Sequence, residues 1–66
     1  MKLTVNGKPV ELPDGSTVIA LLSHLAVEPA RVAIERNQDV IPRRTWSEAQ
    51  LSDGDHIEIV TFVGGG

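Results

Sequence analysis

The sequence of 66 residues contains no cysteine. Disulfide bonds, thiolate metal sites and cysteine nucleophiles are therefore excluded. Trp46 and Phe62 are the only two aromatic residues. No set of neighbouring rings is therefore available to stack on nucleic-acid bases. A basic surplus is also missing, since nine acidic residues outnumber six basic ones and the net charge is −3. The composition thus argues against nucleic-acid binding.

No apolar run approaches the roughly 20 residues that a membrane-spanning helix needs, and no signal-peptide pattern precedes the first predicted strand. We therefore expect no membrane association and a cytoplasmic location. His24 and His56 lie far apart in the sequence, so no metal site is expected. A chain this small buries a thin core without a deep cleft, which favours a carrier or binding module, monomeric when free, over an enzyme.

Residues 2–12 have the pattern of a β-hairpin. Polar and apolar side chains alternate on both sides of Asn6-Gly7, the dipeptide that best suits a type I′ turn. Pro9 has no N–H to donate to a neighbouring strand. The second strand of the hairpin is therefore expected at an edge of the sheet.

One helix is predicted over residues 18–26. Ser16 or Thr17 can cap its start by accepting a backbone N–H bond, and Pro29 prevents its continuation. The apolar residues are spaced at i, i+3, i+4 and i+7, which places them in one stripe: Val18, Leu21, Leu22 and Leu25. The helix is thus expected to pack this stripe against a sheet.

The second half of the chain contains the remaining strands. We expect a strand over residues 31–35, a short strand at 40–41 and a last strand over 56–62. The stretch 43–50 is expected to be irregular or a single turn, with Trp46 closing one end of the core. The order of elements is that of an α+β, ubiquitin-like β-grasp fold, a mixed sheet with one main helix across one face. In that fold the first and last strands are neighbours.

The last predicted strand carries apolar residues near its end that the alternation can place in solvent. If Ile57 and Ile59 point toward the helix, the alternation of side chains turns Val60 and Phe62 toward solvent. Exposed apolar side chains of this kind often mark a docking site. The alternative is that sheet twist and local loops cover both residues. Arg43, which follows a proline, is a further candidate for partner contact, through acidic residues of the partner; a solvated side chain is the alternative.

Three glycines end the chain, so the predicted domain covers residues 1–63 and a flexible tail covers 64–66. Glycines cannot hold a fold, but they can pass through a channel too narrow for any side chain. Gly64 and Gly65 would thread such a channel and present the Gly66 carboxylate to the active site of another protein. The alternative is a frayed end without a function.

Two motifs carry a resemblance to a known family. Residues 32–37 are followed by Val-Ile-Pro-Arg at 40–43 and by Trp46, and residues 53–60 read Asp-Gly-Asp-His-Ile-Glu-Ile-Val before the glycines. Over essentially its whole length the chain resembles the thiamine-biosynthesis sulfur carrier proteins of the ThiS type. That family usually ends in two glycines, whereas this chain has three, so the reactive end is Gly66, or Gly65 if the last glycine is an addition.

The resemblance implies a mechanism. An adenylating enzyme related to ubiquitin-activating enzymes would supply ATP and Mg²⁺ and activate the Gly66 carboxylate. A persulfide sulfur donor would convert the acyl-adenylate to a thiocarboxylate, from which thiazole synthase would take the sulfur. The chain itself would be a protein co-substrate and would bind no cofactor.

Two other functions stay open at this point. Small subunits of molybdopterin synthase, and carriers for other sulfur-containing metabolites, share the fold and the diglycine end. Residues 12–17 also resemble the opening of small β-grasp recognition domains attached to some tRNA synthetases and GTPases. Such a noncovalent module would need no glycine end.

Overall fold

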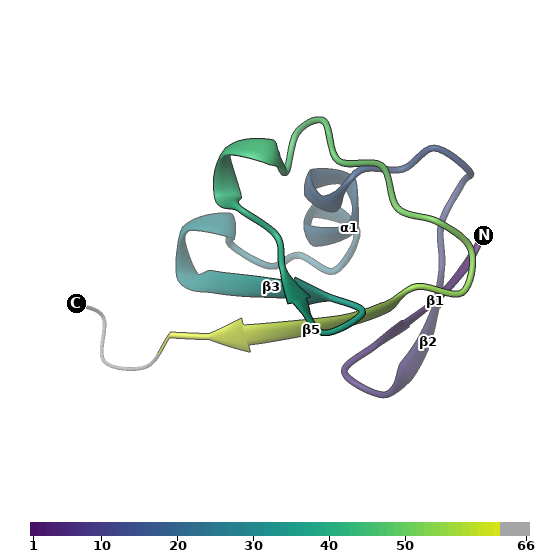
Figure 1. The fold of residues 1–66 in the computed structure, drawn as a ribbon, viewed down its shortest axis with the longest axis horizontal. Helices are drawn as coiled ribbons and strands as arrows, with labels where there is room; N and C mark the ends of the chain where they lie inside the picture. The colour runs from purple at the N-terminus through teal and green to yellow at the C-terminus, as the bar shows by residue number, and fades with distance from the viewer. Residues whose placement is uncertain (63–66) are drawn as a thin grey trace.

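The computed structural model describes residues 1–62, which form a five-stranded mixed sheet with one α-helix on one face (Figure 1). The strands have the order β2-β1-β5-β3-β4 across the sheet. In chain order the elements are β1 Lys2–Val5, β2 Lys8–Glu11, α1 Val18–His24, the 3₁₀ turn η1 Pro29–Arg31, β3 Val32–Arg36, β4 Asp39–Val40, the 3₁₀ turn η2 Arg43–Thr45 and β5 His56–Thr61. This is the predicted α+β arrangement.

The first hairpin forms as the alternation predicts. Asn6 and Gly7 have φ angles of 49° and 81°, as a type I′ turn requires at its two central positions. The turn pairs β1 with β2 in antiparallel register, and β2 lies at the edge of the sheet. Pro9 therefore lies on an edge strand, where its missing N–H is tolerated.

Helix α1 begins where the sequence predicts. Thr17 is its N-cap, and the Thr17 hydroxyl oxygen accepts the backbone N–H of Ala20 at 3.2 Å. The helix places its apolar stripe against the sheet, so that Val18, Leu21 and Leu22 are fully buried. Within residues 1–62 no helix is long and apolar enough to cross a membrane.

The helix ends earlier than the prediction, which extended it to Ala26. It stops at His24, because Ala26 adopts a left-handed conformation with a φ angle of 57°. The Ala26 N–H then bonds the Ser23 carbonyl at 3.1 Å, and the Val27 N–H bonds the Leu22 carbonyl at 2.9 Å. This pair of bonds satisfies carbonyls at the helix end and turns the chain away before the following proline is reached.

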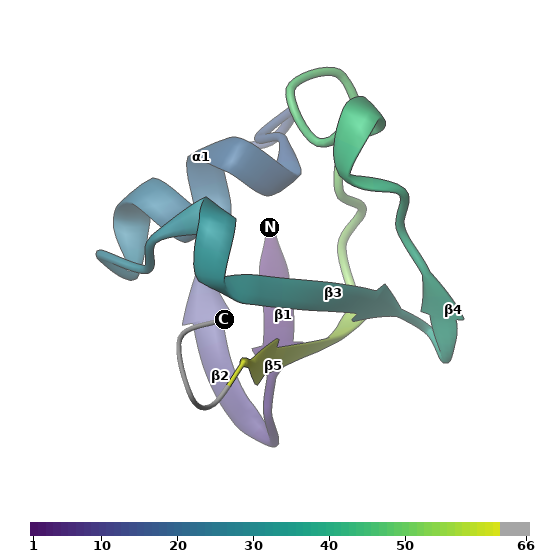
Figure 2. The same cartoon turned by 90° about the vertical axis from the view of Figure 1, so that its left-hand side faces the viewer.

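Strand β5 lies in the centre of the sheet. It runs parallel to β1 and antiparallel to β3, which confirms that the first and last strands are neighbours. Figures 1 and 2 show α1 on one face of this sheet, with the other face left open. The core fills the space between helix and sheet, and its buried members are Leu3, Val5, Leu12, Val18, Leu21, Leu22, Val32, Ile34, Trp46, Leu51 and Ile57.

Candidate docking surface at the end of the central strand

The predicted reactive end, Gly66 with Gly64 and Gly65 before it, lies outside the described residues, and so does the predicted domain boundary at 63–64. The structure describes the chain up to the residue that leads into this segment. After β5 ends at Thr61, the Phe62 N–H donates to the Arg31 carbonyl at 2.8 Å. The glycines therefore follow a backbone position that is bonded to the rest of the domain.

Val60 and Phe62 both face solvent, as the alternation along the last strand predicts. Their exposed fractions are 51% and 54%, whereas Ile57 is 1% exposed and Ile59 is partly buried against the core. Neither sheet twist nor a local loop covers the two exposed side chains. A pair of large apolar groups thus lies in solvent directly before the last four residues, and its contact with a partner remains a prediction.

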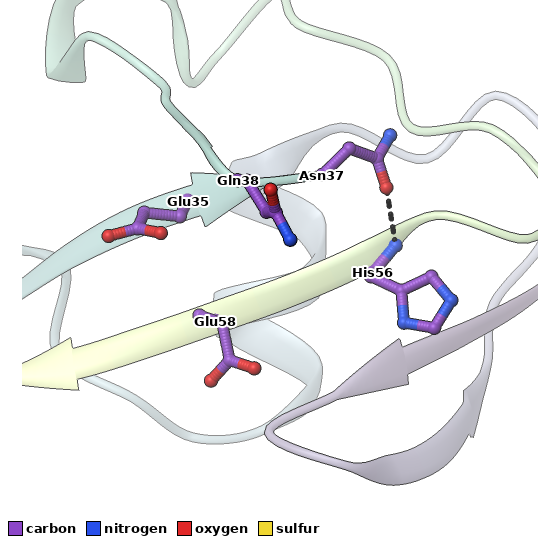
Figure 3. Close-up of a pocket in the computed structure, with 5 residues that line it drawn as sticks. All are labelled: Glu35, Asn37, Gln38, His56 and Glu58. Atoms are coloured by element: carbon purple, nitrogen blue, oxygen red, sulfur yellow. Dashed lines mark hydrogen bonds between the residues drawn. The ribbon is translucent and has the colours of Figure 1, made fainter.

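The open face of β3 and β5 carries a shallow hollow lined by polar side chains (Figure 3): Glu35, Asn37, Gln38, His56 and Glu58. Glu35 and Glu58 are direct cross-strand partners, a placement of like charges that weakens strand pairing. His56 is exposed. Within residues 1–62 no three His, Cys, Asp or Glu side chains are grouped to hold a metal ion.

A buried carboxylate, which the sequence does not predict, fixes the start of β5. Asp55 is 6% exposed. Its two carboxylate oxygens accept the Ser52 backbone N–H at 2.8 Å, the Asn37 side-chain amide at 3.1 Å and the Arg36 guanidinium at 2.8 Å. These bonds join the turn before β5 to the turn after β3, and they satisfy a charge that is expensive to bury unpaired.

Arg43 is bonded to its own chain. Its guanidinium donates to the backbone carbonyls of Pro29 and Val32, the second at 2.9 Å, and it lies over the Trp46 ring with 4.6 Å between the guanidinium carbon and the ring centroid. The sequence predicts only a partner contact or a solvated side chain for Arg43, because an arginine after a proline gives no sign of an internal acceptor. The partner contact of Arg43 stays a prediction.

Known proteins similar to this chain agree with the fold and with the sequence of the chain end. Residues 3–66 match the model of the ThiS family. The chain is 43% identical to the sulfur carrier protein ThiS of Bacillus subtilis over 65 residues, which covers 97% of this chain and 98% of that protein. The crystal structure of a thiamine biosynthesis protein (ThiS) from Geobacter metallireducens superposes with a TM-score of 0.85 at 39% identity, with both chains fully covered.

A longer relative was also found. The chain is 42% identical over its 66 residues to a thiazole synthase of Paramagnetospirillum magneticum, and it spans 20% of that protein's length. The family match over nearly the whole chain and the full-length relatives lead to one conclusion: the chain belongs to the ThiS family of small sulfur carriers with a ubiquitin-like β-grasp fold.

Proposed function

We propose that this chain carries sulfur for thiamine biosynthesis on its last residue. The Gly66 carboxylate is adenylated by an enzyme related to ubiquitin-activating enzymes and is then converted to a thiocarboxylate. Thiazole synthase takes the sulfur from that group. The chain acts in this scheme as a protein co-substrate, and ATP and Mg²⁺ are bound by the adenylating partner.

The chemistry needs little from the carrier. A Gly66 carboxylate oxygen attacks the α-phosphate of ATP, pyrophosphate leaves, and an acyl-adenylate forms. The terminal sulfur of a persulfide donor then displaces AMP from the acyl carbon. A donor thiol cleaves the resulting sulfur–sulfur bond and leaves the thiocarboxylate. Since this chain has no cysteine, its end is the one place where it can hold the sulfur.

The observation that carries the proposal is the position of Val60 and Phe62. Two large apolar side chains lie exposed at the end of the central strand, directly before the last four residues. A partner that covers these two side chains is also placed to receive the residues that follow. The Bacillus subtilis relative, named a sulfur carrier, and the thiazole synthase that contains a region similar to the entire chain support the pathway.

Intact-mass spectrometry tests the proposed chemistry. The chain is incubated with ATP, Mg²⁺, a ThiS-adenylating enzyme and a persulfide donor, and we expect a mass increase equal to the exchange of one oxygen for sulfur at the C-terminus. Omission of ATP is the control and should leave the mass unchanged. An unchanged mass in the complete reaction, with an enzyme that modifies another ThiS protein, would contradict the proposal. Modification without sulfur transfer to thiazole synthase would place the carrier in another sulfur pathway.

The docking role of Val60 is tested by Val60→Ser. A partner that covers Val60 would bury the exposed half of its side chain, and loss of that burial is worth roughly 1–1.5 kcal/mol. We therefore expect the KM of the adenylating enzyme for the carrier to rise about tenfold. Stability should hardly change, because Val60 is 51% exposed.

Val40→Ser is the matched control for the docking experiment. Val40 is 70% exposed and lies on the edge strand β4, at the opposite end of β3 from the residue that pairs with Thr61. We expect no change of KM for this variant. Equal KM values for Val60→Ser and the unmodified chain would remove Val60 from the docking surface.

A further inference from the structure

We propose that Arg43 is a positioning residue that fixes the point where the chain leaves the sheet. It acts through η1, the 3₁₀ turn that holds the backbone of Phe62. The role is distinct from the contact with a partner that the sequence predicts for Arg43. Its kinetic consequence rests on the proposed function, whereas its structural consequence does not.

The geometry consists of two consecutive links. In the first link, the Arg43 guanidinium donates through one nitrogen to the Pro29 carbonyl and through the other to the Val32 carbonyl. These two carbonyls stand at the beginning of η1 and directly after it. In the second link, the Arg31 carbonyl inside this segment accepts the Phe62 N–H at 2.8 Å. Arg43 thus bonds the residues on both sides of the segment in which the Arg31 carbonyl accepts the Phe62 N–H.

The first link depends on the shape of an arginine side chain. A guanidinium is planar and directs several N–H groups in a fixed fork, so that one side chain can bond two carbonyls three residues apart. The Pro29 carbonyl also accepts the backbone N–H of Val32, and an oxygen with two lone pairs can serve both donors. The stack of the guanidinium on Trp46, a core residue that is 2% exposed, fixes the fork from the other side. A lysine has the charge but lacks the fork.

The second link places the chain end. Strand β5 ends at Thr61, and the Phe62 N–H bond extends its pairing one residue beyond the strand. In Figure 1 the blue-green turn of η1 and the C-terminal end of β5 lie at the same end of the molecule. A change in η1 therefore shifts or frees the backbone from which the reactive residues continue, while the core beneath α1 stays in place.

Amide hydrogen exchange tests the structural part on the isolated chain. In Arg43→Met we expect the Phe62 amide to exchange about tenfold faster, because loss of a charge-assisted bond to η1 weakens its acceptor. The Ile59 amide, which is bonded to the Asn6 side chain at 2.7 Å, is the internal reference and should keep its rate. Arg44→Met is the matched control, since the Arg44 side chain is exposed and makes no hydrogen bond or ion pair with a group of residues 1–62. Equal acceleration of both amides, or no acceleration at Phe62, would overturn the proposal.

Kinetics of thiocarboxylate formation separate positioning from docking. A positioning role predicts that Arg43→Lys lowers kcat about tenfold with KM nearly unchanged, because the charge remains and the fork is lost. If Arg43 instead contacts a partner through its charge, Arg43→Lys keeps the normal kcat and Arg43→Met raises KM, which would contradict the positioning role. If the unmodified chain forms no thiocarboxylate, the proposed function fails, and the exchange rates still decide the role of Arg43.

Discussion

Removal of Gly65 and Gly66 is expected to abolish thiocarboxylate formation completely and to leave the domain folded. The deletion moves the terminal carboxylate back by about 7 Å, two residues of extended chain. A misplacement of about 1 Å can already cost a hundredfold in rate. Docking at Val60 should persist, so the shortened chain is expected to compete with the full-length carrier for the adenylating enzyme. Intact mass and a competition assay measure the two effects.

Two controls make this deletion informative. The urea midpoint of the shortened chain should equal that of the full chain, since the core lies within the described residues. Removal of Gly66 alone decides which glycine reacts: loss of activity assigns the reaction to Gly66, and retained activity assigns it to Gly65. Full activity of the chain that ends at Gly64 would contradict the carrier mechanism. If neither chain accepts sulfur and the shortened chain binds a partner as well as the full chain does, the result would support a noncovalent recognition module.

Replacement of Trp46 by alanine is expected to unfold most of the protein at 25 °C. Trp46 is 2% exposed, and truncation of a buried tryptophan costs about 3–5 kcal/mol. A domain of this size has a total stability of about the same magnitude, roughly 3–5 kcal/mol. The change also removes the Nε1–H bond to the Ile41 carbonyl at 2.9 Å and the ring beneath Arg43. Urea denaturation followed by far-ultraviolet circular dichroism measures the loss.

Trp46→Phe is the comparison that separates packing from hydrogen bonding. A phenylalanine keeps a ring in the core but leaves the Ile41 carbonyl without its donor, so we expect a loss of about 1–2 kcal/mol. The melting temperature should fall by roughly 4–8 °C per kcal/mol. A fully folded Trp46→Ala variant with an unchanged urea midpoint would show that Trp46 is not part of the stabilising core.

Local patterns predicted most of the elements because their causes are local. The Asn6-Gly7 turn follows from positive φ angles that these two residues tolerate, and the N-cap of α1 follows from the Thr17 hydroxyl. Alternation of side chains likewise predicts that Val60 is exposed if Ile57 faces the helix, and the structure has Ile57 buried and Val60 exposed. Each of these inferences needs information from no more than a few neighbouring residues.

The missed features depend on residues far apart in the sequence. Asp55 has the sequence context of a turn, and its burial becomes evident only when Arg36 and Asn37 lie beside it. The internal bonds of Arg43 require η1, a turn that the sequence analysis did not predict, at a distance of 14 residues from Pro29. Ala26 has no conformational preference for the left-handed region, so nothing at that position marked the early end of α1.

Asn6 also has a role on the central strand of the sheet. Its side-chain amide accepts the Ile59 N–H at 2.7 Å and donates to the Ile59 carbonyl at 3.2 Å, just beyond the last residue of β1 that pairs with β5. One side chain thus occupies both main-chain groups that another strand would otherwise use. An open strand edge next to exposed apolar residues is a template for self-association. The amide of Asn6 closes that template at Ile59, and so disfavours self-association of the chain through this edge.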